Sequence, residues 1–134
     1  MEDIRKMVRI QIAVLILFVF FKWIRSYILA GDSPELCKLF LLSFPNFCEG
    51  VIGVLTLTGF GIYLNKGFSI KHRLVYIIAI LLAAIYVITQ ELKIHNLGGN
   101  NVYDPNDLIF SIVGLLVGSI IIFRLKPEIK ALSQ

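Results

Sequence analysis

Four apolar stretches dominate the sequence, and each is close to the length that a helix needs to cross a membrane. A hydrocarbon core of about 30 Å takes roughly 20 helical residues. The stretches cover residues 8–27, 47–64, 74–91 and 108–125 of the 134-residue chain. They predict an all-α integral membrane protein, in which residues 1–134 form a single transmembrane domain organised as a four-helix bundle.

The composition agrees with a lipid environment. Hydrophobic residues make up 57% of the chain and charged residues 16%, whereas soluble domains carry roughly 25% charged residues. The net charge of +4 would suit nucleic acid if the basic side chains formed one stripe, but they lie at the ends of the apolar stretches. We therefore expect the lipid bilayer, and no nucleic acid, as a partner.

The start of the chain, with charged residues before an apolar stretch, has the general form of a signal peptide. Lys22, Trp23 and Arg25 stand where a small-residue cleavage motif belongs. We therefore expect a retained first helix, with these three side chains as interfacial anchors near its far end.

A shorter apolar run, residues 36–44, lies between the first two spans. Ser33-Pro34-Glu35 before it resembles a helix start, with proline at the first helical position. The run is too short to cross a membrane, and Pro45 is expected to break it. Two interpretations remain open: a short interfacial or re-entrant segment between helices 1 and 2, and a surface loop with one helical turn.

The distribution of Lys and Arg predicts the orientation, because cytoplasmic loops carry an excess of these residues. Of the 13 basic residues, nine fall on the side that holds both termini and four on the other. The nine are Arg5, Lys6, Arg9, Lys66, Lys71, Arg73, Arg124, Lys126 and Lys130, and the four are Lys22, Arg25, Lys38 and Lys93. Both termini are therefore predicted to be cytoplasmic, with most acidic residues at the outer face.

The polar segment between the last two spans carries a recognisable motif. Asp104-Pro105-Asn106-Asp107 leads into a helix with Gly114 and Gly118. This arrangement resembles the VanZ-like membrane proteins, whose last two spans are joined by a loop ending in an aspartate, two variable residues and a second aspartate. Glu91 or Gln90 approximates the polar residues that end the preceding helix, and Ser111 stands where these proteins often have asparagine. The resemblance covers residues 74–122.

The resemblance implies a multipass protein of the bacterial cytoplasmic membrane. Some VanZ-like proteins reduce susceptibility to the glycopeptide antibiotic teicoplanin, and most have no assigned activity. It therefore favours a non-catalytic envelope protein that binds an amphiphilic molecule at an outward polar mouth. The candidate ligand-binding residues of that mouth are Glu49, Glu91, Asp104 and Asp107.

Two other functions fit the same residues. Glu91 and Asp107, with His95, could supply acid-base groups to an intramembrane enzyme acting on a lipid-linked substrate. Alternatively, the small-xxx-small pair Gly114 and Gly118 could bind other membrane helices in an accessory subunit or a homo-oligomer.

Each carboxylate also has a structural interpretation. Asp104 suits the N-cap of the last helix, with Pro105 at its first position and Asp107 at the third. Glu49 is interpreted as a carboxylate in the first turn of helix 2, or as a partner for Lys22 or Arg25.

The remaining reactive side chains give weaker signals. His95 follows Glu91 by four residues, but no HExxH pattern or further nearby histidine accompanies it, so neither a metal nor a cofactor is expected. Cys37 and Cys48 both fall on the predicted outer side, which permits a disulfide without requiring one.

Overall fold

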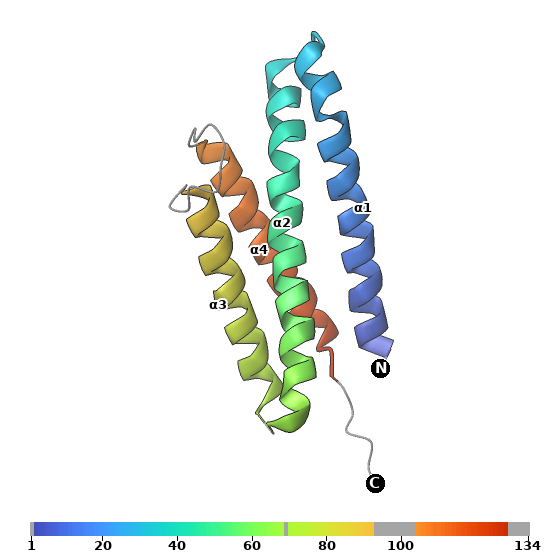
Figure 1. Cartoon of the computed structure of the whole chain (residues 1–134), viewed down its shortest axis with the longest axis vertical. Coiled ribbons are helices and arrows are strands. Elements are labelled where there is room, and N and C mark those ends of the chain that lie inside the picture. Colours follow the sequence, from blue (N-terminus) through green and yellow to red (C-terminus); the bar gives the residue numbers. More distant parts are fainter. Residues whose placement is uncertain (1, 69, 93–103, 129–134) are drawn as a thin grey trace.

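The computed structural model describes residues 2–68, 70–92 and 104–128, and four long helices account for most of them (Figure 1). They are α1 (Glu2–Ala30), α2 (Glu35–Leu64), α3 (His72–Glu91) and α4 (Pro105–Leu125), with a short 3-10 turn, η1 (Asn65–Gly67), after α2. Each of the four is long and apolar enough to cross a membrane. The prediction of an all-helical protein with four candidate membrane spans is therefore confirmed.

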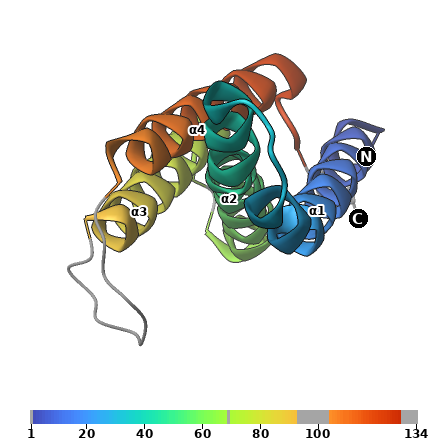
Figure 2. The same cartoon turned by 90° about the horizontal axis from the view of Figure 1, so that it is seen from above.

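The second helix is the centre of the arrangement. It packs against α1, α3 and α4, whereas α1 has little contact with α4. Figure 2 shows α2 between α1 on one side and the α3–α4 pair on the other. Helices α1 and α3 run in one direction and α2 and α4 in the opposite one, so α1 starts at the end where α4 finishes (Figure 1).

Glycines bring the backbones of α2 and α4 into contact. A Cβ atom on Gly50 would lie 2.7 Å from the carbonyl oxygen of Ser111, and one on Gly114 would overlap the backbone of Phe47. Gly118 packs on Val51 and Val54 in the same way. Such close approach is the way in which small residues favour helix association in lipid, and here Gly114 and Gly118 pack within one chain.

The predicted break at Pro45 is wrong. Residues 36–44 are neither a separate interfacial segment nor a loop, because α2 runs from Glu35 through Pro45 to Leu64 as one helix. A proline inside a helix removes one backbone hydrogen bond, and membrane helices tolerate this where neighbouring helices compensate. Pro45 is buried, and the flanking Phe44 and Phe47 stack with a centroid distance of 5.4 Å.

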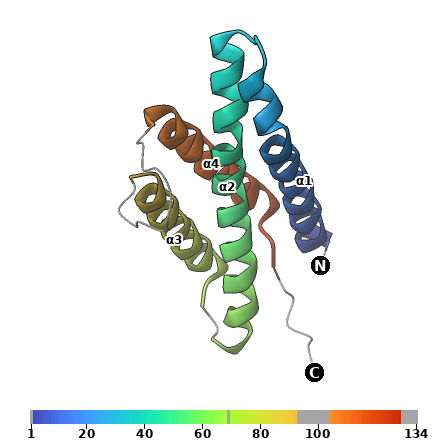
Figure 3. The same cartoon turned by 45° about the horizontal axis from the view of Figure 1, so that its top comes forward.

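The first two helices are longer than the last two. At 1.5 Å per residue, the 30 residues of α2 span about 45 Å and the 20 residues of α3 about 30 Å. Gly53 lies beside Ala83 and Gly61 beside Val75, which places Glu91 level with about residue 45. The beginning of α2 therefore extends about 15 Å past the end of α3. Figures 1 and 3 show that the end of α1 and the beginning of α2 reach beyond both α3 and α4.

Candidate functional site

Asp104 caps the last helix, as its sequence context predicts. Its Oδ1 accepts hydrogen bonds from the backbone N–H of Asn106 at 2.9 Å and from the Asn106 side-chain Nδ2 at 3.0 Å, and Pro105 occupies the first helical turn. A carboxylate here satisfies one of the free N–H groups at the helix start and meets the positive end of its dipole. The structural interpretation of Asp104 is confirmed.

Asp107, one turn into α4, is linked to α2. The Ser43 hydroxyl donates a hydrogen bond to Asp107 Oδ1 at 3.0 Å. Ser43 is only 3% exposed, so its hydroxyl depends on Asp107 for a partner in a setting with little water. This pair ties the N-terminal part of α2 to the start of α4.

Glu91, at the end of α3, is linked to α4 in a similar way. Glu91 is 5% exposed as a residue, and the buried Ser111 hydroxyl donates to Glu91 Oε1 at 3.5 Å. Residues 107 and 111 are four apart on α4, so they share one face. Ser43, Glu91, Asp107 and Ser111 together form what we call the serine–carboxylate cluster, which joins α2, α3 and α4.

Glu49 lies elsewhere, and its predicted place in the first turn of a helix is wrong. Because α2 begins at Glu35, Glu49 is at mid-helix, with a side chain 26% exposed. Lys22 of α1 is its partner, with Nζ 3.9 Å from Glu49 Oε1, and the same ammonium lies 5.3 Å from the centre of the Phe18 ring. Of the two predicted partners for Glu49, Lys22 is confirmed.

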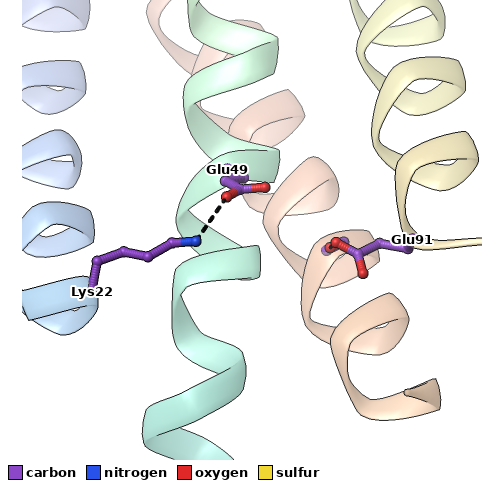
Figure 4. Close-up of polar contacts among 4 residues, drawn as sticks. Lys22, Glu49 and Glu91 are labelled. Carbon is purple, nitrogen blue, oxygen red and sulfur yellow. Dashed lines mark hydrogen bonds and ion pairs between the residues drawn. The ribbon is translucent and has the colours of Figure 1, made fainter. Parts of the chain in front are cut away.

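The four candidate carboxylates therefore occupy three different environments. Figure 4 shows Lys22 reaching from α1 to Glu49 on α2, while Glu91 extends from α3 toward α4. Glu91 and Asp107 share the serine–carboxylate cluster, and Asp104 caps α4 at its N-terminal end. The structure thus brings two of the four residues into one cluster.

Metal and disulfide chemistry can be assessed for the part of the chain that the structure describes. Within it, no group of three His, Cys, Asp or Glu side chains is arranged to hold a metal ion, and His95 lies outside the described residues. Cys37 and Cys48 are free thiols. They are eleven residues apart on one continuous helix, about 16 Å along its axis, and a disulfide needs Cα atoms within about 7 Å.

Comparisons with known proteins assign this chain to no family. No family model, curated protein or solved structure matches the chain. The site is therefore interpreted from its own residues.

A cluster of aromatic side chains lies beside these carboxylates and was not predicted from the sequence. Phe44 contacts Phe21 of α1, with ring centroids 4.5 Å apart, and Phe40 contacts Phe110 of α4 at 5.7 Å. Phe47 completes the set, which we call the phenylalanine cluster. The spacing of Phe40, Phe44 and Phe47 marks one helix face, but only if the helix continues through Pro45.

The phenylalanine cluster and the serine–carboxylate cluster adjoin each other. Phe40 and Ser43 are three residues apart on α2, and Asp107 and Phe110 are three apart on α4, so each pair lies on neighbouring positions of its helix. The Phe40–Phe110 contact and the Ser43–Asp107 hydrogen bond therefore join the same two helices about one turn apart. Phe40 remains 49% exposed, which leaves an apolar ring accessible beside a carboxylate.

Proposed function

We propose that this protein is a non-catalytic, VanZ-like four-helix bundle of the bacterial cytoplasmic membrane that binds an amphiphilic molecule or envelope component. Both termini are cytoplasmic in this proposal, and the phenylalanine cluster faces outward. The observation that carries the proposal is the accessible Phe40 ring beside the Asp107 carboxylate.

The side chains of Phe40, Phe110 and Asp107 indicate which kind of ligand the site would bind. Phenyl rings offer apolar area for a hydrocarbon or aromatic part, and a few convergent polar groups fix orientation in such sites. Asp107 is half-buried and accepts one hydrogen bond at Oδ1, and a carboxylate has further lone pairs. The ligand we propose has an apolar portion on Phe40 and Phe110 and a cationic or hydrogen-bond-donating head at Asp107.

A binding role suits the carboxylates better than catalysis does. Glu91 is 5% exposed and receives the Ser111 hydroxyl, and Asp104 is engaged in the helix cap. A general acid or base must come within hydrogen-bond reach of the reacting group, which a buried or capping carboxylate does not offer. Polar groups at membrane depth nevertheless tend to mark functional sites, and this supports a ligand at Asp107.

The proposal is tested by expressing the protein in a glycopeptide-susceptible bacterium and measuring inhibitory concentrations of teicoplanin and of a glycopeptide without a lipid tail. We expect a selective rise for teicoplanin that Asp107→Asn and Phe40→Ala each abolish. Asp104→Asn is the matched control, because asparagine caps helices as well as aspartate while the same charge is removed. Unchanged susceptibility and envelope integrity on expression, or full protection by the Asp107 and Phe40 variants, would reject the proposal.

A further inference from the structure

A second site lies at the opposite end of α4. A cavity of about 330 Å³ opens between the start of α3 and the end of α4. Its lining residues are His72, Arg73, Tyr76, Phe123, Lys126 and Glu128. The cavity shares no residue with the serine–carboxylate cluster or the phenylalanine cluster, so the proposed amphiphile site does not account for it.

The backbone is held in an unusual conformation to form this cavity. Lys126 follows α4 with φ 47° and ψ 55°, the only positive φ of a non-glycine residue in the described ranges. Glycine normally occupies this left-handed position after a helix, and a side chain there is unfavourable unless the surroundings fix it. The Tyr76 hydroxyl, which donates to the carbonyl oxygen of buried Pro127 at 2.8 Å, supplies that restraint.

The charges around the cavity are available to a ligand. Within the described residues, neither Arg73 nor Lys126 forms an ion pair, and Glu128 forms none with them. Arginine and lysine are the usual protein ligands of phosphate. The two cations outweigh the one carboxylate, so the cavity has a net positive charge when His72 is neutral.

The walls of the cavity are apolar on the side toward the helices. Tyr76 and Phe123 meet edge to face, with ring centroids 6.2 Å apart. Arg73 and Lys126 lie at the ends of two candidate spans, and the rings of Tyr76 and Phe123 lie about one turn closer to the middle of these helices. A phospholipid has the same order, with a charged headgroup followed by apolar chains. Basic pockets between membrane helices are a known form of headgroup site.

We propose that this cavity binds the phosphodiester of a membrane phospholipid. Arg73 and Lys126 contact the phosphate oxygens, and Tyr76 and Phe123 contact the glycerol and the first acyl carbons. Free phosphate shares the anionic chemistry but lacks the apolar portion, so the lipid is the stronger ligand. No bond is made or broken in this binding.

The test uses the purified full chain in detergent and measures retained lipid by native mass spectrometry. The probes are phosphatidylglycerol, phosphatidylethanolamine, diacylglycerol and inorganic phosphate. We expect both phospholipids to bind, with at least about a tenfold loss of affinity in Arg73→Gln, and neither diacylglycerol nor inorganic phosphate to be retained. Lys66→Gln is the matched control, because Lys66 is a cation at the same end of the molecule but lies outside the cavity.

A second variant separates loss of binding from loss of structure. Lys126→Gly removes the cation and also relieves the left-handed backbone, so we expect it to bind phospholipid weakly while remaining folded. If Lys126→Gly and Arg73→Gln retain as much phospholipid as the control Lys66→Gln, the proposed site is wrong. Inorganic phosphate bound as tightly as phospholipid would overturn the assignment to lipid.

Discussion

Replacing Gly114 with alanine tests the close contact between α2 and α4. The added Cβ would overlap the carbonyl group of Phe47, which is backbone and cannot rotate aside. The helices must therefore separate, and such overpacking typically costs about 1–3 kcal/mol. Separation would also stretch the Ser43–Asp107 hydrogen bond, and interhelical bonds of this kind contribute about 0.6 kcal/mol. Alanine gains about 0.5–1 kcal/mol over glycine in a helix, so we expect Gly114→Ala to lower the free energy of unfolding by a net of about 1–3 kcal/mol.

Gly53→Ala is the matched control for this prediction. A Cβ at Gly53 would meet only the Ala83 Cβ, at an ordinary 3.8 Å, and alanine favours a helix by about 0.5–1 kcal/mol over glycine. The two Gly→Ala changes should therefore have opposite signs. Reversible unfolding in mixed micelles, followed by circular dichroism, measures both. If Gly114→Ala is as stable as Gly53→Ala, α2 and α4 do not cross at Gly114.

Three further predictions concern other parts of the structure. Lys126→Gly should raise the free energy of unfolding by about 1 kcal/mol, because the left-handed backbone is no longer strained; an unchanged or lower value in the same unfolding assay would contradict this. A double-mutant cycle of Ser43→Ala and Asp107→Ala, each of which removes one partner of their hydrogen bond, should give a coupling energy of about 0.6 kcal/mol, and strictly additive effects would show that the bond is not formed. Single cysteines at Ser33 and Gly67, in a chain with Cys37→Ser and Cys48→Ala, report orientation in intact cells: labelling at Ser33 alone is expected, and labelling at Gly67 alone would invert the proposed topology.

The sequence predicts helix positions well where hydropathy and helix length coincide. The third predicted span, residues 74–91, agrees with α3, and the fourth, residues 108–125, falls short of the start of α4 only by its cap and first turn. The first span, residues 8–27, is shorter than α1 because hydropathy marks the apolar part of a helix and not its polar ends. The start of α2 near Glu35 agrees with the helix start predicted at Ser33-Pro34-Glu35, but the continuation of the helix through Pro45 was not predicted, because proline usually breaks a helix.

Some features of the site could be predicted from neighbouring residues in the sequence, whereas others depend on contacts between distant segments. The cap at Asp104 follows from neighbouring residues, and so it could be predicted. The Ser43–Asp107 and Glu91–Ser111 pairs depend on how three helices are rotated against one another, which no single segment encodes. Phe40, Phe44 and Phe47 become one face only once α2 is continuous, so the error at Pro45 also hid the phenylalanine cluster.

The looser packing of α1 bears directly on how a ligand would reach the phenylalanine cluster. Only Met7 and Ile28 of α1 are buried, whereas α2 and α4 meet backbone to backbone at Gly50 and Gly114. Segments with few buried contacts open at lower free energy than tightly packed ones. Phe21 joins α1 to the cluster through Phe44, so an incoming apolar group can replace this ring contact while the α2–α4 contact stays intact. We therefore expect ligand entry between α1 and α4, along α2.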